Sequence, residues 1–556
     1  MNLKRFTEPQ EQLTAPIYEV KKINNLRELL NSSAQSFGNN NAFLYKNEAK
    51  EIITKTYTEY KNDVEALGTS LMNLNLNGKK IVVIGNNSYR WCVSYMAVAG
   101  GVGTIVPLDK AIPANEIENL TKQAEPSCVI CEEKYVQIFQ NMNYNIDIIV
   151  SMDTREHRDN VLSFDMLLKE GQDLISSGND IYTKTIPNNE EARIMLFTSG
   201  TTSASKAVLL SNKNVCSNVM SCAQAIKFEP TDILLSFLPI HHTFECLATF
   251  LFGTYSGVCI AFCDGLKHIA ENLKEYNISV FLCVPAILEV LYAKIQKLMK
   301  VNNITSPDFV KTIYPNFRLA IVGAASINKD TVVGFNKFGI RCLQGYGLTE
   351  ASPVLSVEND KETRPGSIGK PLPGIKIKIA NPNTEGIGEI IANGENIMLG
   401  YYNNETATQA TIKDGWLHTG DLGYFDEDGF LYIAGRQKNV IVLDNGKNVF
   451  PEEVEVVLNN SEYIIESFVY PVTKNNRIEL CAEVVYDTEY INEKNGNLSD
   501  SEIYELIGNE IKTINKTLPI YKYIRHYMIT DIPLLKTTTN KIKRYAELQK
   551  LNIDLI

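Results

Sequence analysis

The sequence has no excess of positive charge. It contains 54 Lys and Arg residues against 65 Asp and Glu residues, which gives a formal net charge of -11. A protein that binds nucleic acid needs a basic surface to neutralise phosphates, so this composition argues against a nucleic-acid partner. The N-terminal segment MNLKRFTEPQEQLTAP also lacks the apolar stretch of a secretory signal. We therefore expect no export.

The cysteines lack the arrangement of a zinc site. Eleven are scattered through the chain, mostly within apolar runs. Cys128 and Cys131 form one C-x-x-C pair, but no second pair of ligands lies at a suitable spacing. We expect a plain buried strand there. Cysteines used as small apolar residues are typical of a reducing compartment, so the predicted location is cytoplasmic.

One long segment, Cys246 to Cys263, lacks charge for 18 residues. A membrane span needs a similar length of apolar sequence. However, the residues from Gly253 to Gly257 (GTYSG) interrupt the run in its middle. We therefore predict a buried helix, a turn and a buried strand, and no transmembrane segment.

At 556 residues, with 44% apolar and 21% charged residues, the chain is too long for one ordinary globular domain. Residues 79–109 have the pattern of a strand, a helix and a second strand, and similar strands recur at 278–285 and 317–327. Continuous apolar strands are typical of parallel sheets covered on both faces. The first 430 or so residues are therefore predicted to be α/β.

The pattern changes after Gly415, where Gly and Asp turns separate short alternating strands and indicate antiparallel hairpins. Two helical stretches, at 451–459 and 499–517, then alternate with strand-like segments. They predict a small α+β unit. The expected domains are 1–437 and 438–556, and the polar residues 486–502 are predicted to form a surface loop.

The stretch TSGTTSASKAVLLS, residues 198–211, carries six hydroxyls within eight residues, followed by Lys206. It is not a Walker phosphate loop, which needs G-x-x-x-x-G-K-[ST]. Hydroxyls and backbone amides in a turn after a strand are nevertheless good donors to phosphate oxygens, and a lysine adds positive charge. A flexible serine-rich surface loop is the alternative.

The longer segment LFTSGTTSASKAV resembles the signature loop of the adenylate-forming enzymes, which include acyl-CoA synthetases, peptide-synthetase adenylation domains and luciferases. Ser203, Ser205 and Ala207 depart from the usual pattern T-S-G-T-T-G-x-P-K-G. The resemblance implies that this loop binds the phosphates of ATP through Thr198, Ser199, Gly200, Thr201, Thr202 and Lys206.

Further motifs follow in the order of this family. LPIHHTFE (238–245) is similar to the segment that lines the acyl site, and His242 matches its gating histidine; a core or turn role is the alternative for these two adjacent histidines. GAAS (323–326) resembles the turn that packs against adenine. The resemblance therefore assigns nucleotide contacts to Gly323, Ala324 and Ala325.

QGYGLTEASP (344–353) is the most specific of these motifs. The resemblance implies that Tyr346 stacks on adenine, that Thr349 contacts phosphate and that Glu350 holds Mg²⁺, with Thr349 as a further metal ligand. Gln344 and Gly347 complete the predicted nucleotide contacts. An exposed carboxylate at the start of a helix is the alternative for Glu350.

Three later motifs complete the resemblance. Asp421 in HTGDLG and Arg436 in GRQKN are expected to bind the ribose, and Lys438 is expected to be the hinge of the small domain. Gly446 in LDNGKN would let pantetheine pass close to the backbone. The catalytic lysine of LLKTTTNKIKRYAE falls on Lys541, with Asn540 in place of the customary glycine. A basic tail is the alternative.

The resemblance implies an acyl-CoA synthetase-like fold. This fold has a large N-terminal α/β region with several subdomains, parallel sheets and a β-rich part, and a small mobile C-terminal α+β domain. The implied activity is ATP-dependent conversion of a carboxylic acid to acyl-AMP and then to acyl-CoA, with release of AMP and pyrophosphate. ATP, Mg²⁺ and CoA are the expected cofactors or co-substrates. Lys541, His242 and Glu350 are the expected catalytic residues.

The motifs look most like those of bacterial long-chain fatty acyl-CoA synthetases. Residues 233–244 contain no aspartate to bind an amino group, which argues against amino-acid adenylation. An apolar pocket formed by residues 246–262 would suit a medium or long fatty chain. Open alternatives are an aryl or short acid, transfer to an acyl carrier protein, a luciferase-like oxygenase, and a non-catalytic nucleotide-binding regulator.

Overall fold

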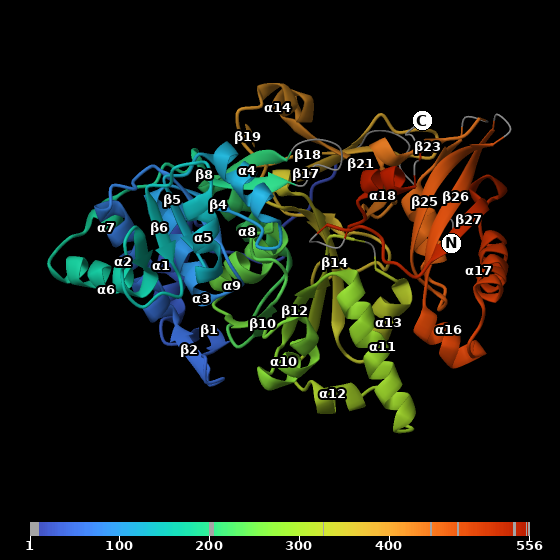
Figure 1. Cartoon of the computed structure of the whole chain (residues 1–556), viewed down its shortest axis with the longest axis horizontal. Coiled ribbons are helices and arrows are strands. Elements are labelled where there is room, and N and C mark those ends of the chain that lie inside the picture. The colour runs from blue at the N-terminus through green and yellow to red at the C-terminus, as the bar shows by residue number, and fades with distance from the viewer. Residues whose placement is uncertain are drawn as a thin grey trace.

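The computed structural model describes residues 11–198, 205–325, 327–444, 447–474, 477–537, 541–551 and 553. Figure 1 shows a broad α/β body and, at its right edge, a unit built by the last quarter of the chain. The body contains two mixed sheets with long parallel runs and one antiparallel sheet. The predicted fold class is therefore confirmed. The domain boundary at 437/438 and the mobility of the smaller unit stay predictions.

The first sheet has eight strands in the order β19-β9-β8-β4-β3-β5-β6-β7. Strands β8 to β7 in this order are parallel, and β9 and β19 are added antiparallel at one edge. The central strands are almost wholly buried because their residues are continuously apolar. The strand bounds are β3 (Lys80–Ile84), β4 (Thr104–Pro107), β5 (Cys128–Cys131), β6 (Ile148–Ser151), β7 (Val161–Ser163), β8 (Ala192–Thr198), β9 (Lys206–Ser211) and β19 (Gly400–Tyr401).

The second sheet has nine strands in the order β16-β15-β14-β13-β12-β10-β11-β1-β2. Its six central strands are parallel, from β14 to β1, and the flanking strands are antiparallel. The bounds are β1 (Asn41–Lys46), β2 (Ile52–Thr56), β10 (Ile233–Ser236), β11 (Cys259–Phe262), β12 (Val280–Cys283), β13 (Leu319–Val322), β14 (Arg341–Gly347), β15 (Val354–Val357) and β16 (Lys370–Pro371).

Three further sheets follow along the chain: an antiparallel one, with hairpins of the kind that the Gly- and Asp-rich pattern predicts, a three-stranded one and a two-stranded ribbon. The antiparallel one contains β17 (Lys376–Ala380), β18 (Gly388–Asn393), β20 (Ile412–Lys413), β21 (Trp416–Phe425) and β22 (Leu431–Arg436). The C-terminal unit has a sheet of β25 (Ile464–Lys474), β26 (Arg477–Tyr486) and β27 (Ile524–Thr530), and a two-stranded ribbon of β23 (Ile441–Val442) and β24 (Asn448–Val449). This unit has its own apolar core, which includes Ile507 and Val454.

Helices cover both large sheets, and α17 and α18 lie on opposite faces of the C-terminal sheet (Figure 1). Several begin at the side-chain caps expected of Ser, Thr and Asn, such as Thr56 before α2 and Ser211 before α8. The longer helices are α1 (Leu26–Phe37), α2 (Tyr57–Asn73), α3 (Tyr89–Ala97), α4 (Ala114–Ala124), α5 (Glu133–Asn141), α6 (Phe164–Ser176), α8 (Asn212–Ala225), α10 (Ile269–Glu275), α11 (Pro285–Val301), α13 (Lys329–Lys337), α14 (Glu405–Thr411), α15 (Pro451–Leu458), α16 (Thr488–Asn495), α17 (Asp500–Asn515) and α18 (Arg544–Lys550).

The uncharged segment forms a buried helix and strand, but its break is shorter than predicted. A π-helix, η2 (Glu245–Leu251), continues directly into α9 (Phe252–Ser256), so Gly253 is helical. Only Gly257 ends the helix, with φ +75°. A Cβ at this position would lie 2.3 Å from the Phe37 ring, which explains why glycine ends the helix here.

The prediction of a loop over residues 486–502 is wrong in its first half, because α16 occupies 488–495. The Asp487 side chain accepts a hydrogen bond from the Tyr490 backbone and caps this helix. Ile491 anchors the helix through a fully buried side chain. One apolar position in eight residues gives no helical periodicity to recognise.

Cys128 and Cys131 lie buried in β5, which confirms the predicted strand. Within the described ranges, no group of three or more His, Cys, Asp or Glu side chains is arranged to hold a metal ion. None of the helices in the described part of the chain combines the length and the apolar character that crossing a bilayer requires.

Candidate active site

The candidate site lies where the carboxyl end of β14 meets the antiparallel sheet. Tyr346, near the end of β14, is buried, and its hydroxyl donates a hydrogen bond to Asp421 Oδ2 at 2.7 Å. Asp421 lies in β21 directly opposite Arg436 of β22, and Arg436 Nε lies 3.0 Å from Asp421 Oδ1. The structure therefore brings together three of the residues predicted to bind the nucleoside.

Glu350 follows β14 in a one-turn helix, η4 (Thr349–Ala351). Its Oε1 accepts a hydrogen bond from the Tyr401 hydroxyl at 2.8 Å. Lys206, at the start of β9, places its ammonium group 4.8 Å from the centre of the Tyr401 ring. Tyr401 lies in β19, which pairs with β9, so the edge of the first sheet holds the predicted phosphate ligand Lys206 close to Glu350.

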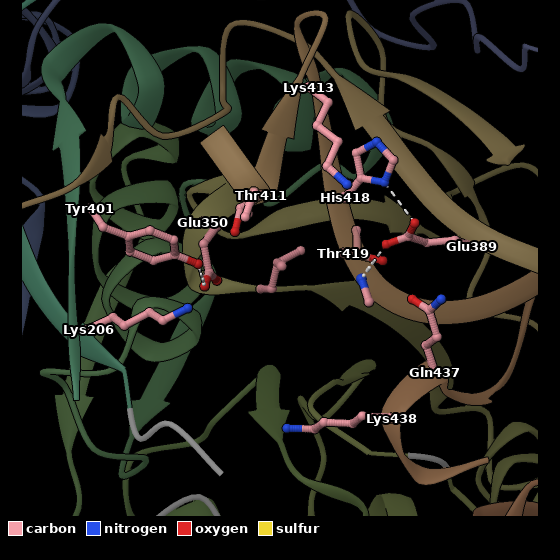
Figure 2. Close-up of a pocket in the computed structure, with 13 residues that line it drawn as sticks. Lys206, Glu350, Glu389, Tyr401, Thr411, Lys413, His418, Thr419, Gln437 and Lys438 are labelled. Carbon is pink, nitrogen blue, oxygen red and sulfur yellow. Dashed lines mark hydrogen bonds and ion pairs between the residues drawn. The ribbon is translucent and has the colours of Figure 1, made fainter. Parts of the chain in front are cut away.

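A polar cavity of about 440 Å³ opens beside these residues. Figure 2 shows Lys206, Tyr401 and Glu350 on one side of it and His418, Glu389 and Gln437 on the other, with Lys438 below. Three lysines and one histidine line the cavity together with only two carboxylates. This balance suits an anionic ligand such as a phosphate chain.

Sequence reasoning missed several of the lining residues. His418 Nδ1 lies 2.7 Å from Glu389 Oε2, and the backbone N–H of Gly420 donates to Glu389 Oε1 at 3.0 Å. This pair fixes the strand immediately before Asp421. His418 stands within the recognised HTGDLG motif, but Glu389 and Tyr401 lie in segments without a motif. The remaining missed lining residues are Leu348, Ala410, Thr411, Lys413, Thr419 and Gln437.

Lys541 reaches this region from the C-terminal unit. The surrounding protein desolvates its ammonium group and holds the pKa of Lys541 below the usual lysine range, and Arg436 adds repulsion. Asp421 and Glu350 oppose this effect with their negative charges. The predicted catalytic lysine therefore lies within electrostatic range of the predicted ribose and metal residues.

His242 lies in the loop after β10, next to His241, and the charge of Lys541 also affects its pKa. Burial, His241 and Lys541 together lower the pKa of His242 to about 3, so the ring is neutral at neutral pH. Its Nδ1 lies 3.4 Å from the backbone nitrogen of Phe244, which donates to it. His241 Nε2 lies 3.6 Å from Asp109 Oδ2, across the junction of the two large sheets.

The turn after β13 has the close packing that its small residues require. A Cβ at Gly323 would lie 3.1 Å from the Phe244 ring, and Ala324 has a left-handed φ of +72°. The neighbouring Ala325 is exposed. On the next strand, Gln344 is buried, and its Nε2 finds no hydrogen-bond partner within the described residues. A buried amide of this kind is a donor available to a ligand.

Of the remaining predicted residues, some lie in the described part of the chain and others lie outside it. Thr198 ends β8 and donates a hydrogen bond to the Lys206 carbonyl at 3.3 Å, and Lys438 lines the polar cavity. Gly347 packs against the Pro353 carbonyl, and Thr349 is half-buried in η4. Five predicted contacts lie outside the described residues: Ser199, Gly200, Thr201, Thr202 and Gly446. Ser203 and Asn540, which depart from the family pattern, also lie outside them.

The apolar segment expected to form an acyl pocket packs into the core. Phe250 of η2 makes edge-to-face contacts with Trp91 and Tyr95, at ring distances of 6.4 and 5.8 Å. All residues from Glu245 to Thr254 are buried. A chain-binding cavity along this segment stays a prediction.

Known proteins share sequence and fold with this chain. The family model described as AMP-binding enzyme matches residues 30–402. A peroxisomal long chain acyl-CoA synthetase 7 from Arabidopsis thaliana is 25% identical over 509 residues, which cover 82% of this chain and 71% of that protein. A luciferin 4-monooxygenase from Photuris pensylvanica is 29% identical over 390 residues, covering 66% and 69%.

Among solved structures, an anthranilate CoA ligase in complex with anthranoyl-AMP has a TM-score of 0.79 against this chain. The two chains are 19% identical, and the match covers 97% of this chain and 98% of that one. This likeness establishes the shared fold. The family match, which spans more than half of the residues and includes β14 with Tyr346 and Glu350, shows that the chain belongs to the family of AMP-binding enzymes.

Proposed function

We propose that the protein activates a medium- or long-chain fatty acid with ATP and transfers the acyl group to CoA. The observation that carries this proposal is the ion pair of Asp421 and Arg436 beside the polar cavity that Glu350 lines, with Lys541 within electrostatic range of all three. These residues come from opposite ends of the motif series and share one electrostatic environment. Adenylation needs a positively charged side chain close to both the nucleotide phosphates and the substrate carboxylate.

In the first half-reaction, a carboxylate oxygen attacks the α-phosphorus of ATP. A new P–O bond forms, the bond between the α-phosphorus and the bridging oxygen breaks, and pyrophosphate leaves. Two anions approach each other, so catalysis depends on positioning and on charge compensation. We assign this role to Lys541 at the carboxylate and α-phosphate and to Lys206 at the leaving phosphates. No nucleophile from the protein is required.

The residues present suit a magnesium ion bound together with substrate. Mg²⁺ prefers oxygen ligands and is commonly held by one or two carboxylates plus phosphates and water. Glu350 offers a carboxylate whose Oε1 is oriented by Tyr401, and Thr349 offers a hydroxyl. Magnesium would supply charge that offsets the phosphate oxygens. Glu350 and Thr349 would hold it.

In the second half-reaction, the CoA thiol attacks the acyl carbon and a C–S bond forms. The bond between the acyl carbon and the phosphate oxygen of AMP breaks, AMP leaves, and the thiol proton passes to solvent. We propose that Lys541 leaves the reaction site before the thiol enters, through a rotation of residues 438–556 about Lys438 between the two steps. His242 is neutral, and we assign it a hydrogen-bonding role at the acyl carbon rather than a charged one.

The choice of a fatty acid rests on three observations. Residues 233–244 contain no aspartate that could bind the amino group of an amino acid. Phe244 packs over Gly323 beside His242, which gives the acyl side an apolar surface. The relatives include long-chain acyl-CoA synthetases. The anthranilate ligase of the same fold makes aromatic acids the first competing class to test.

The test is carboxylate-dependent pyrophosphate release from ATP, with acids from acetate to oleate and with anthranilate, in the presence and absence of CoA. We expect a burst with long-chain acids that becomes steady turnover when CoA is added. A burst that CoA cannot relieve would indicate a carrier-protein thiol as acceptor. Release only with anthranilate or acetate would overturn the fatty-acid assignment.

A further inference from the structure

Glu452, at the start of α15, lies where three segments meet. Its Oε1 accepts a hydrogen bond from Asn439 Nδ2 at 2.5 Å, and Arg544 Nε lies 3.5 Å from the same oxygen. The other oxygen, Oε2, is buried and has no hydrogen-bond partner among the described residues. A carboxylate oxygen left in this state is costly, so packing alone does not account for a glutamate here.

The two partners of Glu452 flank residues that the proposed function uses. Asn439 directly follows the hinge residue Lys438, and Arg544 lies three residues after Lys541. A single carboxylate oxygen thus connects Asn439, the residue after the hinge, to the segment that carries the catalytic lysine.

Further contacts make this connection stiff on the side of Lys541. Arg544 forms an ion pair with Glu455, one helical turn after Glu452, and donates to the Val469 carbonyl at 3.2 Å. Glu455 is buried and also accepts a hydrogen bond from the Val469 backbone at 2.7 Å. The start of α18 is therefore fastened to α15 and β25.

Glu452 also contacts the strand that precedes the hinge. A Cβ on Gly435 of β22 would lie 3.1 Å from Glu452 Oε2 and 3.1 Å from Phe450. The glycine backbone therefore allows α15 to pack directly against β22. Gly435 comes before the hinge and Glu452 after it, so a rotation about Lys438 must separate this contact.

We propose that Glu452 is a positioning residue that transmits the orientation of the hinge to Lys541, a role that rests on the proposed function. With Asn439 and Arg544 bound to one carboxylate, the residues after the hinge turn as one rigid body. In the orientation that the structure describes, the same carboxylate rests against Gly435, and Lys541 lies within electrostatic range of Asp421 and Glu350. Without it, Lys541 loses its fixed distance from the hinge.

The neighbouring Glu453 provides a matched control. It lies in the same turn of α15 and has the same charge, but its partner is Lys522, at 2.7 Å. Among the described residues, its side chain forms no hydrogen bond or ion pair with the hinge or with α18. Glu453→Gln therefore removes an equal charge and an ion pair of α15 without touching the proposed connection.

The experiment measures both half-reactions in Glu452→Gln and Glu453→Gln. We expect Glu452→Gln to slow acyl-AMP formation by about 10-fold, the scale of one charge-assisted hydrogen bond. Thioester formation from supplied acyl-AMP should stay within about 2-fold of the wild type, because that step does not need Lys541 in place. Equal loss in both half-reactions, or the same change in Glu453→Gln, would overturn the proposal.

Amide hydrogen exchange gives a readout that does not depend on activity. Glu452→Gln should speed exchange in residues 541–551 and 437–440 together, whereas Glu453→Gln should leave both segments unchanged. Asn439→Ala serves as the second variant if Glu452→Gln is unstable, and it should speed exchange in the same two segments. Unchanged exchange in these variants refutes the connection, whereas a wild type that forms no acyl-AMP with any acid refutes the proposed function alone.

Discussion

At the scale of single residues, Lys541 carries the strongest mechanistic expectation. It is the one predicted catalytic side chain that comes from the C-terminal unit, and it lies within electrostatic range of Asp421 and Glu350 but forms an ion pair with neither. A cation in this state can engage substrate anions instead of protein carboxylates. Its contribution should therefore be confined to the half-reaction in which charge must be offset.

We expect Lys541→Ala to abolish acyl-AMP formation and to leave thioester formation from supplied acyl-AMP largely intact. The measurement is pyrophosphate release for the first step and CoA consumption for the second. Lys536→Ala is the control, because Lys536 lies in the same segment but pairs with Glu466. Equal loss of both half-reactions in Lys541→Ala would contradict this division of roles.

Glu350 is the residue for which a metal role can be separated from a structural one. Glu350→Gln should raise the magnesium concentration needed for half-maximal pyrophosphate release by about 10-fold, since one carboxylate ligand is lost. Tyr401→Phe is the control, because it removes the hydrogen bond to Glu350 and keeps the carboxylate. Unchanged activity of Glu350→Gln at limiting magnesium would exclude the ligand role.

At the scale of secondary-structure elements, the turn that joins β22 to the C-terminal unit contains the proposed hinge residue, Lys438. The one-turn helix η5 (Gln437–Asn439) is short, and no strand of the antiparallel sheet continues through it. A change of backbone angles at Lys438 would reorient the following helix and sheets without breaking a β-ladder within either part.

We expect Lys438→Pro to slow thioester formation while acyl-AMP formation is retained. Proline fixes φ and restricts the residue before it, so rotation at this position is hindered. Lys438→Ala is the control, because it removes the side chain from the polar cavity but keeps a free backbone. Normal thioester formation in Lys438→Pro would count against the hinge.

The sequence predicted those elements whose pattern is local. The β3–α3–β4 unit has apolar runs and a Ser88 cap, and α17 begins with a capping box at Ser499, so both were recognisable. The helix α16 was not, since only Ile491 is buried. The order of nine strands in the second sheet depends on pairings between distant residues, which no local pattern records.

The same difference applies to the candidate site. Tyr346, Asp421 and Arg436 each lie in a motif, and the resemblance brought them together before any contact was known. Glu389 reaches the cavity through the pairing of β18 with β21, and Tyr401 through the pairing of β19 with β9, which is far away in sequence. Their roles follow from tertiary contacts, and a resemblance based on motifs does not reach them.

At the scale of the whole molecule, Glu245 links pH to stability. It is fully buried in η2, where Ser236 and Thr249 donate hydrogen bonds to it, and burial raises its pKa to about 8. In the unfolded chain the carboxyl loses its proton near its ordinary pKa of 4.5. Between these two values the folded state retains a proton that the unfolded state releases.

The free energy of unfolding should therefore fall as pH rises from about 4.5 to 8, by up to about 1.4 kcal/mol per pH unit from this group. Glu245→Gln removes this pH-dependent contribution to the free energy of unfolding. We expect its melting temperature to exceed that of the wild type increasingly from pH 5 to pH 8. The exposed Glu427→Gln is the control, and a constant offset of Glu245→Gln across this range would refute the assignment.

The pairing of β19 with β9 also bears on how the chain folds during synthesis. Gly400 lies opposite Leu209, so the edge of the first sheet is completed only after roughly 190 further residues have emerged. At about 5 to 20 residues per second, this takes about 10 to 40 s on the ribosome. During that interval β9 presents an unpaired edge that other chains could join. The nascent protein therefore passes through a stage that favours aggregation, and chaperones that bind exposed strands would act on it then.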